Sequence, residues 1–191
     1  MQRSANIEQL RALIRDVPDF PKRGIVFKDI TPLLRHPDGL SLAVQYLTEP
    51  FEDLRVDVVA AAESRGFIFA TAVARNLSAG FVPIRKPGRL PAATRAEAYE
   101  LEYGTDSLEI HDDAIHPGDR VLMVDDLLAT GGTMQACCNL VRGLGGDIVG
   151  CAFLIELSQL NGRQKLVAYP VHSLLRYPVD APNGDGAASR A

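Results

Sequence analysis

The segment VLMVDDLLATGGT, residues 121–133, combines residue types that can bind a sugar phosphate. Two adjacent carboxylates, Asp125 and Asp126, end an apolar run. Carboxylates accept hydrogen bonds from vicinal hydroxyls and hold Mg²⁺ directly or through water. The backbone N–H groups of the following small-residue loop can converge on a phosphate at the positive end of a helix. That loop consists of Ala129, Thr130, Gly131, Gly132 and Thr133.

The same segment lacks two common nucleotide-binding motifs. No lysine follows its glycines, as a Walker A loop requires, and the pattern G-x-G-x-x-G is absent. An NTPase and a dinucleotide-dependent dehydrogenase are therefore disfavoured. Thr-Gly-Gly-Thr alone is also typical of a tight turn beside a solvated strand end, but the thirteen residues together favour a phosphate-binding site.

Apolar runs alternate with helical spacing along the chain, which predicts a mostly parallel sheet with helices on both faces, an α/β fold. Ligands of such sheets bind beyond the carboxyl ends of the strands. Polar residues at these ends are Glu63–Arg65, Arg85 and Lys86, and the loop after Asp125. The spacing predicts strands at 56–64, 80–84, 121–126, 147–155 and 168–175, and helices at 1–17, 38–53, 66–76 and 133–144.

Composition limits the function classes. The 191 residues carry 20 Lys and Arg against 24 Asp and Glu, a net charge of -4, which argues against coating of nucleic acid or anionic lipid. The apolar runs are too short to span a bilayer and the N-terminus lacks the features of a secretory signal, so we expect a cytoplasmic protein that does not bind membranes. The 3 cysteines, two of them adjacent, are expected to be small core residues.

The segment 121–133 resembles the phosphoribosyl diphosphate (PRPP) binding motif of type I phosphoribosyltransferases. Further segments resemble the adenine-specific members of that family, in the same order along residues 7–177. They are PDFPKRGIVFKDITPLL (18–34), ESRGFIFA (63–70), IRKPGRLP (84–91) and YELEYGTDSLEIH (99–111). The resemblance implies the type I fold and transfer of a phosphoribosyl group from PRPP to N9 of adenine, with AMP and pyrophosphate as products and Mg²⁺ as cofactor.

The resemblance also implies roles for individual residues. Asp125 and Asp126 would hold the ribose hydroxyls, with Mg²⁺ bound mainly through PRPP and water near them, and residues 129–133 would bind the 5′-phosphate. Arg65, Lys86 and Arg89 would contact pyrophosphate. The resemblance further implies a non-proline cis peptide, which falls at Glu63-Ser64.

A polar excursion over residues 87–119 matches the family's flexible active-site loop, with possible hairpin strands at 98–103 and 107–111. Within it Glu102 matches the catalytic glutamate and Tyr103 its neighbour. A carboxylate there can accept the proton that adenine loses and can stabilise positive charge at C1′. Glu102 could also be one more solvated acid, since spacing alone does not separate the two roles.

The N-terminal segment would form a hood over the base, with Val26, Phe27 and Lys28 as adenine contacts. Many family members have arginine at the position of Lys28, and lysine lacks the planar fork of a guanidinium. We therefore expect a helix and hood over residues 1–35, a core over 36–177 and a disordered tail over 178–191. A homodimer is implied by the family.

Two other functions remain open from the sequence. One is a PRPP-binding regulatory protein, which the short N-terminal segment and the Glu102 loop disfavour. The other is a phosphoribosyltransferase for another purine.

Overall fold

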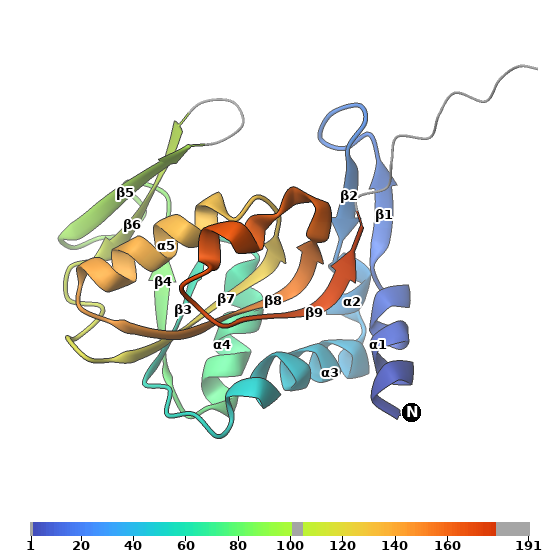
Figure 1. Ribbon diagram of the computed structural model, residues 1–191, viewed down its shortest axis with the longest axis horizontal. Coiled ribbons are helices and arrows are strands. Elements are labelled where there is room, and N and C mark those ends of the chain that lie inside the picture. Colours follow the sequence, from blue (N-terminus) through green and yellow to red (C-terminus); the bar gives the residue numbers. More distant parts are fainter. Residues whose placement is uncertain (1, 101–104, 179–191) are drawn as a thin grey trace, which may run out of the picture. The chain divides into compact units, whose positions relative to one another are not determined.

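The computed structural model describes residues 2–100 and 105–178. These residues fold as two compact units, one comprising the N-terminal residues up to Leu42 with Pro178, and the other Ala43–Tyr177. The unit boundary falls within helix α3 (Pro37–Thr48). Figure 1 labels the elements of both units.

The N-terminal unit contains a two-stranded antiparallel hairpin. Its elements are α1 (Gln2–Ala12), β1 (Arg15–Pro18), β2 (Val26–Asp29) and α2 (Thr31–Arg35). The expected helix over 1–17 is wrong beyond Ala12, because residues 15–18 pair with β2 instead. Two cross-strand ion pairs, Arg15 with Asp29 and Lys28 with Asp16, stabilise the hairpin. Pro18 also disfavours helical backbone at the residue before it.

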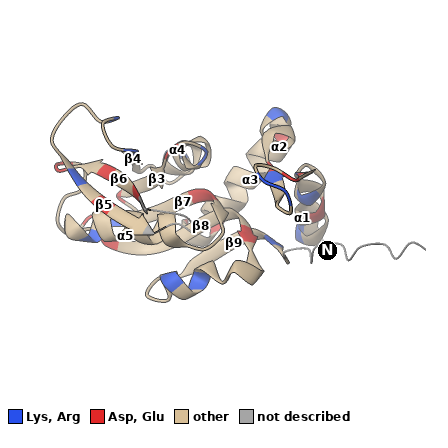
Figure 2. Ribbon diagram, turned by 90° about the horizontal axis from the view of Figure 1, so that it is seen from above, with Lys and Arg blue, Asp and Glu red and all other residues tan. Residues whose placement is uncertain are grey.

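The larger unit contains a five-stranded parallel sheet in the order β4-β3-β7-β8-β9. Helices α4 (Gly66–Asn76) and α5 (Gly132–Gly143) cover opposite faces of it (Figures 1 and 2). This arrangement confirms the predicted α/β fold. The strands are β3 (Val58–Ala62), β4 (Gly80–Ile84), β7 (Arg120–Leu128), β8 (Asp147–Leu157) and β9 (Val171–Tyr177).

The sheet is buried on both faces, which explains why its strands are continuous apolar runs rather than alternating ones. Four consecutive residues of β7, from Val121 to Val124, have no exposed surface. Cys137, Cys138 and Cys151 are buried free thiols, as predicted, and burial raises the pKa of Cys137. Among the described residues, no helix has the length and apolar character needed to cross a bilayer.

A second antiparallel hairpin, β5 (Thr94–Glu100) and β6 (Thr105–His111), occupies much of the polar excursion. Its strands are displaced from the expected ranges 98–103 and 107–111. Backbone hydrogen bonds between Arg85 and Glu109, at 2.9 and 2.7 Å, join β6 to the end of β4. Leu108 and Ile110 are buried in the core, so apolar contacts as well as these hydrogen bonds anchor the hairpin.

The described residues also form three short 3-10 helices, namely η1 (Glu49–Phe51), η2 (Ser158–Leu160) and η3 (Gly162–Leu166). The expected helix over 38–53 ends at Thr48, where η1 with Pro50 follows. The last strand lies at Val171–Tyr177 rather than 168–175. Basic and acidic residues are interspersed along the ribbon of the larger unit (Figure 2).

Candidate active site

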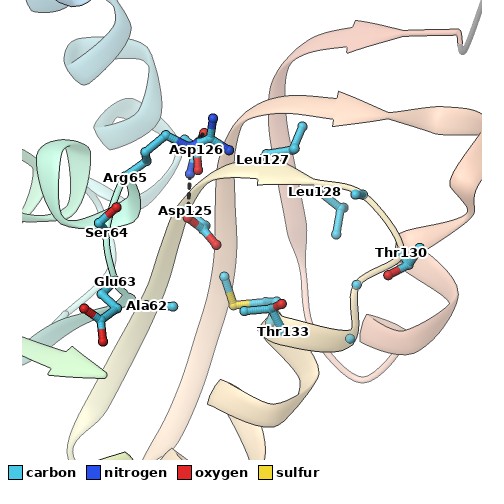
Figure 3. Close-up of a pocket in the computed structure, with 14 residues that line it drawn as sticks. Ala62, Glu63, Ser64, Arg65, Asp125, Asp126, Leu127, Leu128, Thr130 and Thr133 are labelled. Atoms are coloured by element: carbon cyan, nitrogen blue, oxygen red, sulfur yellow. Dashed lines mark hydrogen bonds and ion pairs between the residues drawn. The ribbon is translucent and has the colours of Figure 1, made fainter. Parts of the chain in front are cut away.

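A cavity of about 360 Å³ lies where β3 and β7 end. Parallel strands place their carboxyl ends at one edge of the sheet, and the segments that follow β3 and β7 meet there. Figure 3 shows the side chains that line it. The lining residues are Ala62, Glu63, Ser64, Arg65, Asp125, Asp126, Leu127, Leu128, Ala129, Thr130, Gly131, Gly132, Thr133 and Met134.

The loop between β7 and α5 forms one wall of this cavity, as the sequence predicts. Gly131 has a φ of 78° and immediately precedes the first residue of α5, Gly132. This left-handed backbone favours glycine. Because the N–H groups of a first helical turn have no partners within the helix, the α5 terminus offers backbone donors to an anion. The N-cap residue, Gly131, has no side chain that could cap the helix.

Asp125 and Asp126 lie together near the end of β7, which continues to Leu128 rather than ending at residue 126 as expected. The Asp126 backbone N–H donates to Oδ1 of Asp125 at 2.9 Å, and the Asp126 carboxylate is buried. A Cβ at Gly66 would lie 2.8 Å from Asp125 Oδ1, so the start of α4 approaches this carboxylate closely.

Burial raises the pKa of both carboxyl groups. The charge of Asp126 adds to this effect on Asp125, while Arg65 partly opposes the rise in the pKa of Asp126. The crowded negative charge suits a cation or hydroxyl donors.

Arg65 precedes α4 and extends towards Asp126 (Figure 3), with its Nε 2.9 Å from Oδ2 of that carboxylate. The sequence predicts a pyrophosphate contact for Arg65, and the structure places it in the same cavity as the phosphate-binding loop. The peptide Glu63-Ser64 is cis, as the resemblance implies.

The cation cluster, which we define as Arg85, Lys86 and Arg89, follows β4. Neither Lys86 nor Arg89 is among the residues lining the cavity, although the sequence groups them with Arg65. Arg85 pairs with Glu63 at 3.0 Å. Lys86 donates its backbone N–H to Glu63 and pairs through Nζ with Asp106 on β6. Arg89 is exposed.

The Lys86 ion pair changes the pKa of its two partners in opposite directions. Burial would lower the pKa of Lys86, but the interactions with Asp106 and Tyr99 raise it overall. The hydrogen bond from Lys86 lowers the pKa of Asp106. The Tyr99 hydroxyl donates to Asp106 at 3.2 Å. Burial raises the pKa of Tyr99, and an interaction with the Thr133 side chain partly opposes that rise. The β5–β6 hairpin is thereby linked to both the cation cluster and the phosphate-binding loop.

The structure does not place the remaining predicted residues relative to this cavity. Glu102 and Tyr103 fall outside the described residues. Val26, Phe27 and Lys28 belong to β2 of the N-terminal unit. There Phe27 packs edge-to-face on Phe20, with ring centroids 5.2 Å apart, and Lys28 Nζ lies 2.8 Å from Asp16. The ion pair with a cross-strand neighbour gives Lys28 a defined role in the hairpin.

Sequence reasoning placed Glu63 at a strand end without its ion-pair role, and it missed the contributions of Tyr99 and Asp106. The position of Glu63 directly after a buried strand indicates a strand-end site. Its two hydrogen-bond donors, Arg85 and Lys86, follow a different strand, β4, and this position does not reveal them. Asp106 and Tyr99 are directly opposite each other in the hairpin register. That pairing depends on where the hairpin turns, so composition alone does not distinguish Asp106 from neighbouring acids.

The site also fits the expected magnesium ion. Among residues 2–100 and 105–178, no group of three or more His, Cys, Asp or Glu side chains could hold a metal ion. Mg²⁺ commonly takes one or two carboxylates and completes its shell with water and substrate phosphates. Asp125 and Asp126 can supply such ligands.

Comparisons with known proteins agree with this geometry. Residues 32–176 match the model of the phosphoribosyl transferase domain family. An adenine phosphoribosyltransferase of Rhodopirellula baltica is 58% identical over 171 residues, which cover 90% of this chain and 83% of the relative.

Solved structures give the same result. The crystal structure of adenine phosphoribosyltransferase from Rhodothermus marinus is 55% identical with a TM-score of 0.87, covering 91% of this chain and 99% of the other. The enzyme of Saccharomyces cerevisiae, crystallised with adenine and an imino-altritol bisphosphate, is 38% identical with a TM-score of 0.85, covering 90% and 99%. The chain therefore belongs to the adenine phosphoribosyltransferase family, within the phosphoribosyl transferase domain family.

Proposed function

We propose that the protein transfers the 5-phosphoribosyl group of PRPP to N9 of adenine, giving AMP and pyrophosphate in purine salvage. The observation that carries the proposal is the cavity after β7, which joins a backbone phosphate-binding loop to two carboxylates. The protein of Saccharomyces cerevisiae, similar over 90% of this chain, was crystallised with adenine. That complex supports adenine as the base.

Residues 129–133 are the proposed site of the 5′-phosphate, bound by backbone N–H groups and the two threonine hydroxyls. Asp125 and Asp126 are the proposed acceptors for the ribose 2′- and 3′-hydroxyls. Both carboxylates border the same cavity as the loop, which supports one ligand that reaches both. Val26, Phe27 and Lys28 remain the proposed contacts for adenine.

Arg65, Lys86 and Arg89 are the proposed contacts for pyrophosphate. Arg65 is paired with Asp126 and Lys86 with Asp106, so both cations exchange a carboxylate for phosphate oxygens when PRPP binds. The exchange is favoured because pyrophosphate carries more negative charge than a single carboxylate. Arg65 and Asp126 then separate, so that Arg65 binds the pyrophosphate group and Asp126 binds the ribose hydroxyls.

In the proposed reaction, N9 of adenine forms a bond to C1′ as the bond from C1′ to the pyrophosphate oxygen breaks. The electron pair of the broken bond leaves with pyrophosphate, and the proton of the adenine ring is accepted by Glu102. Negative charge near C1′ stabilises the positive charge that develops there. Exclusion of water by the segment that carries Glu102 and Tyr103 would prevent hydrolysis of PRPP.

Mg²⁺ is the proposed cofactor, held through PRPP and water with Asp125 and Asp126 nearby. When bound, it neutralises phosphate charge and assists departure of pyrophosphate. The proposed assembly is a homodimer, which light scattering of the purified protein tests.

The decisive experiment measures PRPP-dependent nucleotide formation with adenine, hypoxanthine, guanine and uracil. We expect AMP from adenine and far slower turnover of the other bases. Equal turnover of hypoxanthine would contradict adenine specificity but leave the PRPP site intact. Absence of turnover with every base, together with specific DNA binding, would favour a regulatory protein.

A further inference from the structure

The turn between β8 and β9 lies against the phosphate-binding loop. In Figure 1 this orange-red turn lies beside the start of α5. A Cβ at Gly131 would come 2.5 Å from the carbonyl oxygen of Gly162, and a Cβ at Gly162 would overlap the carbonyl oxygen of Ala129. Neither backbone can accept a side chain at this point, so glycine is required on both sides of the contact.

An ion pair holds the turn in place. Glu156, near the end of β8, is 5% exposed and accepts two hydrogen bonds from Arg163, at 2.7 and 2.8 Å. Arg163 also donates to the Val171 carbonyl at 2.9 Å and to Ser173 Oγ at 3.2 Å. The guanidinium next to Gly162 is therefore tied to both β8 and β9, and such forked contacts fix orientation as well as distance.

The local backbone supports the same arrangement. Asn161 has a φ of 54° and precedes η3, and its carbonyl accepts from the Gln164 N–H at 2.9 Å. Leu166, at the end of η3, is buried in the core. Gly162 is thereby held between Asn161, whose backbone is left-handed, and Arg163, whose side chain is fixed by its contacts with β8 and β9.

The phosphate-binding loop itself has little that would fix its shape. It consists of small residues, and Gly131 begins α5 without a side-chain cap. Backbone N–H groups bind an anion well only when they are already oriented towards it. The loop therefore needs support from outside, and the Gly162 backbone contacts it at Ala129 and Gly131.

We propose that Gly162, held by the Arg163–Glu156 ion pair, is a positioning element that fixes the phosphate-binding loop and so sets affinity for the 5-phosphate end of PRPP. Gly162, Arg163 and Glu156 are not among the residues that line the cavity. This inference rests on the proposed function, because it presupposes that a sugar phosphate binds at the loop.

The test compares two ligands that represent the two ends of PRPP. Ribose 5-phosphate and pyrophosphate are titrated calorimetrically into the wild type and into Gly162→Ala. We expect the variant to bind ribose 5-phosphate at least about tenfold more weakly, the effect of losing one hydrogen bond to a charged oxygen. Pyrophosphate affinity should stay within about twofold, whereas general structural damage would weaken both ligands.

Gly80→Ala is the matched control for this variant. A Cβ at Gly80 would meet no atom closer than 3.7 Å, and the residue lies at the start of β4, at the opposite end of that strand from the cation cluster. Its affinities should equal those of the wild type. Unchanged ribose 5-phosphate binding by folded Gly162→Ala would overturn the proposal.

A second pair of variants tests the ion pair and does not depend on how well Gly162→Ala folds. Arg163→Lys keeps the charge but loses the fork, and should weaken ribose 5-phosphate and raise KM for PRPP several-fold with little change in kcat. Arg176→Lys is its control, since Arg176 also contacts Glu156, at 3.3 Å, but lies on β9. Equal effects of the two variants would contradict a role specific to Arg163.

The outcomes separate this inference from the proposed function. A wild type that binds neither ribose 5-phosphate nor PRPP refutes the proposed function. If the wild type binds both ligands and the ribose 5-phosphate affinities of Gly162→Ala and Arg163→Lys are unchanged, only the positioning role of Gly162 is refuted.

Discussion

The proposed phosphate-binding loop and the cation cluster offer an anion different kinds of contact. The loop after β7 uses backbone and glycine, and its shape is in place without ligand. Arg85 and Lys86, by contrast, are each held by a carboxylate, Glu63 and Asp106. Preformed backbone donors need no rearrangement to bind, whereas a paired cation must first leave its partner. We therefore expect the two regions to respond differently to substitution.

The largest effect is expected at Gly131. Gly131→Ala combines a left-handed φ of 78° with a Cβ 2.5 Å from the Gly162 carbonyl oxygen. Displacement of the loop should lower ribose 5-phosphate affinity by at least about a hundredfold, as for two lost hydrogen bonds to charged oxygens. Isothermal titration calorimetry measures it.

Gly118→Ala is the control for Gly131→Ala. Gly118 has a φ of 87° but nothing within 4 Å of a Cβ. It should lose about 1 kcal/mol of stability through backbone strain and no affinity. Comparable losses of affinity in both variants would show that strain alone explains the result.

A smaller effect is expected from Lys86→Met in the cation cluster. Loss of a charged donor should weaken pyrophosphate by about tenfold while ribose 5-phosphate stays unchanged. Competition against PRPP in the AMP-forming assay measures both ligands. Lys165→Met, at an exposed lysine of η3, is the control. Equal losses of affinity for pyrophosphate and ribose 5-phosphate in Lys86→Met would contradict the distinction between the two regions.

Asp106→Asn should act in the opposite direction. Removing the negative charge of Asp106 leaves Lys86 without its ion-pair partner, so pyrophosphate should bind about two- to fivefold more tightly, the scale of an exposed ion pair. The hairpin should keep its fold because Leu108 and Ile110 remain buried. Asp112→Asn, at the residue that follows β6, is the comparison variant. Weaker pyrophosphate binding by Asp106→Asn would mean that Asp106 orients Lys86 for binding rather than competing for it.

The smallest effect concerns pH and Glu63. Burial would raise the pKa of Glu63, but hydrogen bonds from Lys86 and Arg85 hold it below the ordinary value of 4.5. Its contribution to stability is therefore complete above that value and is lost as pH falls below it. Urea unfolding between pH 7 and 3 should show the wild type losing at most about 1 kcal/mol more than Glu63→Gln. Equal pH dependence would show that this ion pair does not stabilise the fold.

Sequence reasoning worked where a motif is contiguous. The loop after Asp126 is built from neighbouring residues, so their order predicted both the end of a strand and the start of a helix. The helix over 66–76 and the strand over 80–84 match because their apolar periodicity coincides with their burial. The expectation failed at residues 15–18, where pairing with a strand farther along the chain outweighs local helical spacing.

The residues of the candidate site show the same difference between contiguous motifs and contacts made by distant segments. Arg65 was found because it directly follows a predicted strand, and the structure places it in the cavity. Asp106 was not found, since its role depends on the register that sets it beside Tyr99 and on the contact of that hairpin with β4. Arg163 was also missed. A turn separates it from its partner Glu156, and the spacing of residue types does not predict how that turn folds back.

The chain order of residue types determines the parallel α/β core, the acidic end of β7 and the glycine loop, because each follows from local geometry and burial of neighbouring residues. Tertiary structure decides which carboxylate holds which cation and which backbone supports the loop. Ion pairs such as Lys86 with Asp106, and the contact of Gly131 with Gly162, join segments far apart in the chain. Their formation depends on how the strands and turns pack, which the periodicity of a single segment does not specify.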